Sequence, residues 1–196
     1  MNGPMRAEQA SIGARGIDTI LTLDAVKCAA LKNTNIDFVV RYLSSLSAAE
    51  VQTILSSGLA LFVCTYADVW DGNGAAAHAK NLNLPTGCTI WLDVESCGDL
   101  TADDVIARVN TWAYAVRGAG YDPGLYVGCD CKLSSAQLTT LSVDRYWRSC
   151  SYVPEPSVGF AMMQLSPGNT TWAGILVDVD VCQHDYRGRA ATWIKG

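Results

Sequence analysis

Short apolar runs alternate with helix-like segments along the whole chain, and this rhythm limits the possible folds more than any other feature of the sequence. Because a strand, a helix and a second strand form a βα unit, the repetition predicts an α/β protein on a mostly parallel sheet. No linker rich in proline, glycine and serine divides the chain. Strands are expected at eight places: residues 14–18, 37–43, 59–66, 88–94, 124–128, 145–148, 158–164 and 174–181.

The segments between these runs carry helix start and stop signals. Ser47 and Glu50 have the spacing of a capping box, and Gly58 lies where a helix-terminating glycine belongs. Thr101 and Asp104 repeat the device before a longer amphipathic stretch. Shorter helices are expected at 24–32, 74–82 and 134–141, and the last connections are too short for full helices.

Eight strands in βα order predict a TIM-type (β/α)8 barrel. Such barrels have about 250 residues, so a chain of 196 residues predicts a small, irregular barrel with an incomplete outer ring of helices. The alternative is an open doubly wound sheet, which needs a phosphate-binding glycine loop after its first strand. The segment GARGIDTILT contains no G-x-G-x-x-G, which disfavours that fold.

Composition narrows the range of partners. A hydrophobic content of 49% is enough for one domain spanning residues 1–196. A net charge of -5 without any run of lysine and arginine argues against binding of nucleic acid. No stretch approaches the roughly 20 apolar residues of a membrane span, and the first residues lack the apolar core of a signal peptide. We expect a protein without a membrane span, most simply a monomer.

The cysteines and histidines do not predict a metal site or a cofactor. The sequence has two histidines and no Cys-x-x-Cys pair, so a zinc site is disfavoured. Most of the eight cysteines are expected to be core or surface thiols. Pairing of Cys88 with Cys97, or of Cys131 with Cys150, remains open at this point.

Two of the expected strands combine an apolar face with an acidic one. Because alternate residues of a strand point to the same side, Trp91, Asp93 and Glu95 share one face and Ile90, Leu92 and Val94 share the other. The last strand repeats this pattern. Its acidic face carries Leu176, Asp178 and Asp180.

Barrel enzymes place their chemistry at the carboxyl ends of the strands, so carboxylates on several strands would gather in one cleft. Close carboxylates raise at least one pKa, which gives a site a proton donor beside an ionised partner, as glycoside hydrolysis requires. Aromatic side chains around the cleft would suit the flat faces of sugar rings. The polar and aromatic residues expected at the strand ends are Asp18, Arg41, Tyr42, Tyr66, Asp93, Glu95, Tyr126, Trp147, Gln164, Asp178 and Asp180.

Several of these residues also have structural interpretations. An aspartate at a strand end is often the N-cap of the next helix. Arg41 is as easily an ion-pair partner as a ligand contact, and Trp147 and Tyr126 fit a core position equally well. In the loop ADVWDGNG, Asp68 and Asp71 suit a turn, with a weak indication of calcium.

The order and spacing of several short motifs resemble a known family. GIDT at 16–19, RYL at 41–43, WLDVE at 91–95, GLYVG at 124–128, Gln164 and VDVD at 177–180 resemble the glycoside-hydrolase-like domain family (domain of unknown function 1906). That family is similar to the family 25 lysozymes, irregular TIM barrels that cleave peptidoglycan. The resemblance covers residues 13 to 183.

The resemblance implies roles for particular residues. It implies Glu95 as the general acid and Asp93 as its companion carboxylate, with Asp18 and Asp178 completing the catalytic cleft. Binding of substrate would fall to the remaining strand-end residues, which are Arg41, Tyr42, Tyr66, Tyr126, Trp147, Gln164 and Asp180. The chain departs from the family 25 pattern at two positions, with Asp180 in place of an asparagine and Met163 in place of a tryptophan.

The leading hypothesis is therefore a hydrolase of peptidoglycan or a related polysaccharide, without a cofactor. A catalytically silent glycan-binding barrel is the second hypothesis. A metal-dependent hydrolase that uses Asp18, Asp93, Glu95 and Asp178 as oxygen ligands is the third. A cell-wall substrate implies action outside the cytoplasm, in the cell wall, the periplasm or the extracellular space, by a route that the sequence does not reveal.

Overall fold

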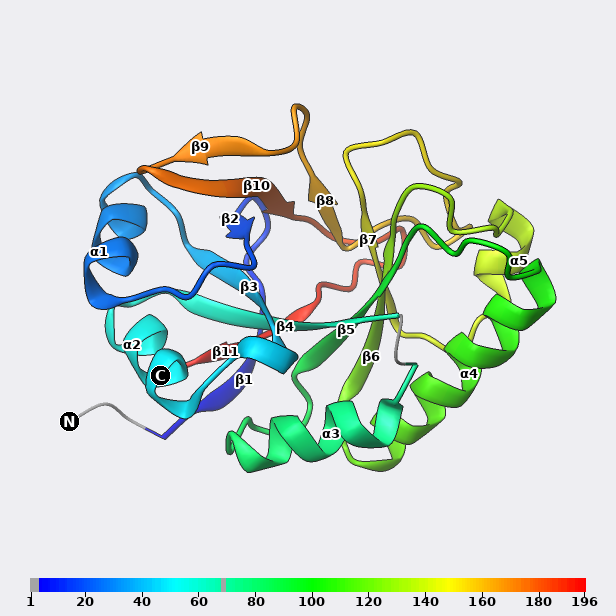
Figure 1. Ribbon diagram of the computed structural model, residues 1–196, viewed down its shortest axis with the longest axis horizontal. Helices are drawn as coiled ribbons and strands as arrows, with labels where there is room; N and C mark the ends of the chain where they lie inside the picture. Colours follow the sequence, from blue (N-terminus) through cyan, green and yellow to red (C-terminus); the bar gives the residue numbers. More distant parts are fainter. Residues whose placement is uncertain (1–3, 68–69) are drawn as a thin grey trace.

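Eight strands form a closed barrel in the computed structural model, which describes residues 4–67 and 70–196 (Figure 1). Each strand pairs with the next around the ring, and pairing of β4 with β5 closes it. The predicted α/β barrel is confirmed, and each of the eight expected strands is present. The ring consists of β2 (Arg15–Asp18), β3 (Phe38–Tyr42), β4 (Ala60–Tyr66), β5 (Thr89–Val94), β6 (Asp122–Val127), β7 (Arg145–Arg148), β8 (Met162–Gln164) and β10 (Ile175–Cys182).

The strand β10 runs antiparallel to both of its neighbours, β2 and β8, whereas the other ring strands are parallel. The chain between β8 and β10 contains only the short strand β9 (Thr170–Trp172), which pairs with β10. A parallel strand needs a crossover of about a dozen residues or more, usually helical, so this short connection returns the chain antiparallel. The reversal decides the depth of the carboxylates on β10, as described below.

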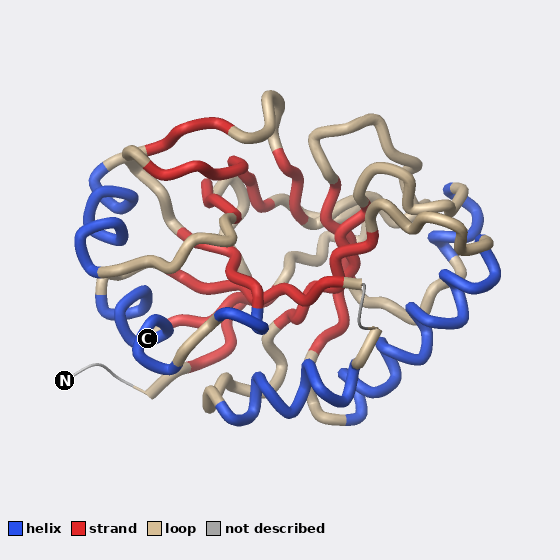
Figure 2. The backbone as a smooth tube through the Cα atoms, in the orientation of Figure 1, coloured by secondary structure: helices blue, strands red, loops and turns tan. Residues whose placement is uncertain are grey.

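Helices cover only part of the barrel (Figure 2). Side chains of Asp24, Ser47, Asp71, Thr101 and Ser134 cap their first turns. The capping box predicted at Thr101 and Asp104 is complete. At Ser47 only the serine side chain caps the helix, because the Glu50 carboxylate binds Arg41 and the Leu23 amide instead. No helix is found between β7 and β8 or between β8 and β10, so the outer ring is incomplete, as predicted. The helices are α1 (Ala25–Asn33), α2 (Ala48–Ser56), α3 (Gly72–Asn81), α4 (Ala102–Gly118) and α5 (Ser135–Thr139), with a 3-10 turn η1 (Leu43–Ser45).

Aromatic side chains fill the interior of the barrel. Phe62 packs against Phe38, Trp91 and Trp193 with ring centroids 5.3–6.2 Å apart. Trp193 comes from β11 (Thr192–Lys195), which pairs with β4 and with β1 (Arg6–Gln9). The strands β1, β9 and β11 were not predicted from the sequence. Because these aromatic side chains fill the interior, the open end of the barrel is the one formed by the carboxyl ends of the parallel strands.

The cysteines are all free thiols. Neither pairing left open above is formed, and geometry explains why. Cys88 and Cys97 lie beyond opposite ends of β5, whose six residues span roughly 20 Å. Cys131 packs in the core outside the barrel, whereas Cys150 lines the cleft inside its mouth.

Candidate active site

The strand β5 delivers two carboxylates to the open end of the barrel. Its inward face carries Trp91 in the aromatic interior and then Asp93, which is 3% exposed. Glu95 follows just past the strand end and is exposed. The Tyr42 hydroxyl donates a hydrogen bond of 2.9 Å to Asp93 Oδ2. The two residues therefore lie at different depths, with Asp93 inside and Glu95 at the rim.

Gly128, just past β6, makes room for Glu95. A Cβ atom at this position would lie 2.3 Å from Glu95 Cβ and 2.8 Å from its Oε2. The Gly128 amide donates to the Val94 carbonyl at 3.0 Å, which fixes the two strand ends side by side. The Glu95 side chain thus lies directly over a glycine that no larger residue could replace without moving it.

The strands β2 and β10 supply the facing carboxylates. Asp178 pairs in register with Asp18, the last residue of β2, and Asp180 pairs with Gly16 below it. Because β10 is antiparallel, the later residue is the deeper one, and Asp180 is fully buried. Asp178 is half-buried at the rim and accepts a hydrogen bond from the Asn169 amide.

Asp18 and Asp180 are neighbouring acids, and each affects the pKa of the other. Burial, followed by repulsion from Asp178, raises the pKa of Asp18 to about 7. Burial also raises the pKa of Asp180 well above its usual range, and next to this come the charge of Asp18 and the hydrogen bond to it. Gln164 Nε2 donates to Asp18 at 3.1 Å, and Trp147 Nε1 donates to Asp180 at 2.9 Å. Both acids therefore favour the protonated form more than an ordinary aspartate does.

This arrangement explains why an aspartate can stand where the family 25 pattern has an asparagine. An asparagine donates through its NH2 group, and a protonated carboxyl donates through its O–H. At the second departure, Met163 lies on the outward side of β8, while Gln164 faces the cleft.

Glu95 has the electrostatic surroundings of a proton donor. Partial burial, and then repulsion from Asp178, raises the pKa of its carboxyl above the usual value. Among the described residues that line the cleft there is no lysine, arginine or histidine to offset these carboxylates. A site with this charge balance favours the protonated form of its carboxyl groups.

The carboxylates and several loop residues enclose a cavity of about 290 Å³. Tyr126 donates a hydrogen bond of 3.1 Å to Gln164 Oε1 on one wall. A neighbouring cavity shares Glu95 and Asp178 with the first and extends toward Tyr66, whose ring stacks on Tyr42 at 4.1 Å. Trp147 forms the floor, with 2% of its surface exposed.

Sequence reasoning missed the loop residues of the cleft. These side chains follow β7 and β8 rather than belonging to the strands, and extending the strand-end rule by a few residues would have found some of them. They are Ser149, Cys150, Ser151 and Asn169.

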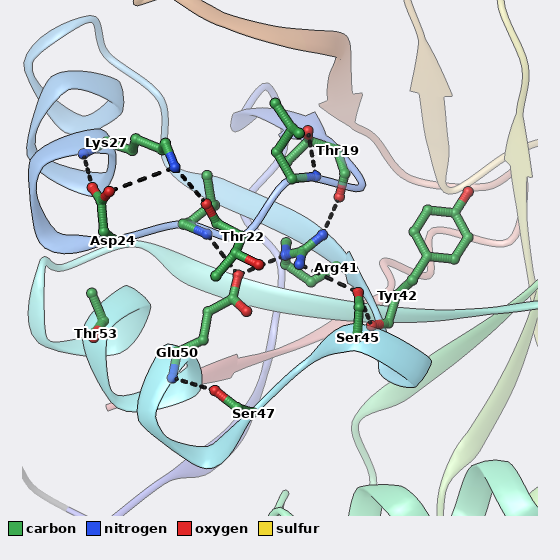
Figure 3. A network of polar contacts seen from close by, with 12 residues as sticks. Thr19, Thr22, Asp24, Lys27, Arg41, Tyr42, Ser45, Ser47, Glu50 and Thr53 are labelled. Carbon is green, nitrogen blue, oxygen red and sulfur yellow. Dashed lines mark hydrogen bonds and ion pairs between the residues drawn. The ribbon is translucent and has the colours of Figure 1, made fainter.

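Arg41 requires a correction, because the structure does not place it in the cleft. It is fully buried on the outward face of β3, where its Nε donates to Glu50 Oε1 at 2.8 Å (Figure 3). Its other nitrogens donate to the Thr19 carbonyl and to the Ser45 hydroxyl. Strict alternation of side chains along β3 predicts the outward position of Arg41, since Arg41 and Tyr42 are adjacent and must face opposite sides. Arg41 is thus a structural ion-pair partner instead of the predicted substrate contact.

Two further predictions concern the loop before α3. Asp71 Oδ1 accepts from the Gly74 amide at 2.8 Å and caps the helix, in agreement with the turn interpretation. Asp68 lies outside the described residues. Within residues 4–67 and 70–196, no three histidine, cysteine, aspartate or glutamate side chains are arranged to hold a metal ion. The metal-dependent alternative therefore gains no support from the geometry.

Solved structures with the same fold were found by comparison. A family 25 glycosyl hydrolase from Bacillus anthracis has a TM-score of 0.62 at 12% identity, over 90% of this chain and 91% of its own. An uncharacterized protein from B. stearothermophilus has a TM-score of 0.67 at 19% identity, over 87% and 96%. The Tat-secreted protein Rv2525c of Mycobacterium tuberculosis, solved with L-tartrate, has a TM-score of 0.64 at 12% identity, over 90% and 100%.

At the level of sequence, no curated protein matches this chain. A family model does match it, over residues 29–192, which include seven strands of the barrel and Asp93, Glu95, Asp178 and Asp180. The chain belongs to the family of Rv2525c-like, glycoside hydrolase-like domains.

Proposed function

We propose that the protein is a glycoside hydrolase in which Glu95 is the general acid. The observation that carries the proposal is the position of Glu95 at the mouth of a cleft lined by carboxylates, with its pKa raised by burial and by Asp178. A carboxyl that keeps its proton beside other carboxylates is the arrangement that glycosidic bond cleavage requires.

In the proposed reaction, Glu95 transfers its proton to the glycosidic oxygen as the bond from that oxygen to the anomeric carbon breaks. The positive charge that develops on the sugar ring is stabilised by the carboxylates of the cleft. Asp93 or Asp178 then either activates the attacking water or supports the oxocarbenium-like transition state. Asp180 lies deeper, below the level of Asp18 and Asp178, and is proposed to support Asp18 from the floor of the site.

Peptidoglycan or a related polysaccharide is the proposed substrate. The stacked rings of Tyr42 and Tyr66 lie at the rim of the cleft, where they could pack against a sugar ring. Proteins of the same fold include a muramidase from Acremonium alcalophilum and the catalytic domain of an endolysin from a Listeria bacteriophage. Tyr126 and Gln164, on the opposite wall, are proposed to bind substrate hydroxyl groups.

Such a substrate places the proposed action outside the cytoplasm. The similar protein Rv2525c is Tat-secreted. In the described part of this chain, no helix has the length and apolar character to span a bilayer.

Substitution of the general acid tests the proposal. We expect Glu95→Gln to lower the release of reducing ends from purified peptidoglycan by about 10²- to 10⁴-fold, with an unchanged circular dichroism spectrum. Glu8→Gln, at an exposed position on β1, is the matched control and should keep full activity. Mass spectrometry of the released fragments would identify the bond.

Retained activity in Glu95→Gln would refute the assignment of the acid. Binding of peptidoglycan by the unaltered protein without any product would instead indicate the silent glycan-binding barrel.

A further inference from the structure

A second cavity, of about 560 Å³, lies on the outside of the barrel over β7 and β8, where no helix covers the sheet. Arg148 and Met163 come from the outward faces of these strands, and Tyr152, Tyr186 and His184 come from the loops above them. This cavity shares no residue with the acidic cleft. The loop after β7 separates the two, since Ser149 to Ser151 line the cleft and Tyr152 to Glu155 line the outer cavity.

Tyr186 is held as a rigid platform at this cavity. A Cβ atom added to Gly159 would lie 3.1 Å from each of three atoms of the Tyr186 ring, so the glycine packs flat against one face. The Tyr186 hydroxyl donates to Glu155, and its backbone amide donates to the Val158 carbonyl at 2.8 Å. The residue Tyr186 is nevertheless 74% exposed, so the face of its ring away from Gly159 is open to solvent.

Hydrogen bonds to the Asp185 carboxylate stabilise the segment that carries Tyr186. Asp185 accepts hydrogen bonds from the amides of Arg187 and Arg189, and Arg189 Nε also donates to it at 2.9 Å. An aromatic ring that is fixed before a ligand arrives loses little conformational entropy on binding.

Arg148 provides the second observation. Its side chain is half-buried in the cavity wall, yet within residues 4–67 and 70–196 it makes no hydrogen bond, ion pair or ring contact. Four other arginines of this chain have partners: Arg41, Arg117 and Arg189 pair with carboxylates, and Arg145 donates to the Ala190 carbonyl. A guanidinium presents planar donors that match a carboxylate, so a partly desolvated one without a partner points to an anionic group on a ligand.

We propose that this outer cavity is a second binding site, separate from the acidic cleft, for a saccharide that carries a carboxylate. The sugar ring packs on the open face of Tyr186, the carboxylate accepts hydrogen bonds from Arg148, and the exposed His184 contacts the ring hydroxyls. The site holds such a glycan whether or not the acidic cleft cleaves it. The mixture of aromatic and polar lining is typical of a small-molecule site.

Isothermal titration calorimetry on the Glu95→Gln protein tests this proposal without interference from hydrolysis. The probes are an oligogalacturonate, whose sugars carry carboxylates, and a neutral chitin oligosaccharide of the same length. We expect the oligogalacturonate to bind at least tenfold more tightly than the chitin oligosaccharide. Arg148→Gln and Tyr186→Ala should each weaken its binding at least tenfold.

Two controls separate the site from the general surface. Arg187→Gln changes an exposed arginine next to the site that does not line the cavity, and Tyr114→Ala changes an exposed tyrosine on α4. Both should leave binding unchanged. The proposal is overturned if the oligogalacturonate does not bind at millimolar concentration, if both probes bind equally, or if Arg148→Gln and Tyr186→Ala bind as the parent does. The parent protein with an intact Glu95 should bind with the same affinity, so the outcome is independent of hydrolytic activity.

Discussion

Two pairs of buried ionisable side chains stand on opposite sides of the barrel wall. On the outside, Arg41 and Glu50 neutralise one another, with side chains 0% and 2% exposed. On the inside, no cation among the described residues pairs with Asp18 or Asp180, and burial raises the pKa of both acids instead. The charges of the outer pair therefore balance each other, whereas burial raises the pKa of both acids of the inner pair. Burial of ionisable side chains does not by itself create a functional site. The two pairs differ in whether a buried charge is balanced by an opposite charge or by a bound proton.

The outer pair is also connected to the inner one. Arg41 donates to the carbonyl of Thr19, the residue that follows Asp18, and Glu50 accepts from the Leu23 amide at 2.8 Å (Figure 3). The ion pair thus anchors the loop that leaves β2 at the mouth of the barrel. The ion pair of Arg41 and Glu50 outside the barrel therefore stabilises the backbone next to Asp18 inside it.

The largest expected effect comes from breaking the outer pair. Glu50→Gln leaves the Arg41 guanidinium buried without a countercharge, so we expect a loss of about 3–5 kcal/mol in the free energy of unfolding, measured by urea denaturation. Glu8→Gln removes the exposed pair of Arg6 with Glu8 and should cost less than about 1 kcal/mol. Equal losses in the two variants would show that burial of the outer pair has no special energetic role.

On the cleft side, a change should appear in activity more than in stability. Gly128→Ala places a methyl group where Glu95 lies, so the carboxyl must move, and we expect kcat to fall about tenfold or more while KM changes little. Overpacking would cost about 1–3 kcal/mol of stability. Gly118→Ala, at the end of α4 with no atom within 4 Å of its added Cβ, is the control and should leave kcat unchanged. An unchanged kcat in Gly128→Ala would contradict the role of Glu95.

The smallest effect is a change in pH dependence at the inner pair. The pKa of each acid is higher in the folded protein than its ordinary value of 3.8, so the stability contributed by their protons is complete below about pH 4. It is lost as the pH rises, through about 7 for Asp18. Asp180→Asn keeps a hydrogen-bond donor to Asp18 and removes one titrating group. We expect it to be more stable than the parent at pH 8, by on the order of 1–2 kcal/mol.

Thermal unfolding between pH 5 and pH 8 measures this effect. The melting temperature of the parent should decline more steeply with pH than that of Asp180→Asn, and the exposed variant Asp99→Asn should follow the parent. Parallel curves for the parent and Asp180→Asn would rule out a raised pKa at Asp180.

Sequence by itself determined the strand ring and the inward direction of the acids. The alternation in TIWLDVES and GILVDVDV determined which side chains face the lumen, because successive side chains of a strand point to opposite faces of the sheet. The same rule, applied strictly to RYL, would have turned Arg41 outward. Capping signals at Ser47 and Thr101 located two helices because these interactions are local.

Only the tertiary structure decided what depends on distant segments. It reversed β10 and so placed Asp180 below Asp178, because strand direction follows from the path of the connecting chain. It brought Gly128 under Glu95 and Asp180 against Asp18, contacts between residues 33 and 162 positions apart in sequence. Raised pKa values at Asp18 and Glu95 arise from burial and from neighbouring charges, neither of which exists until the barrel closes.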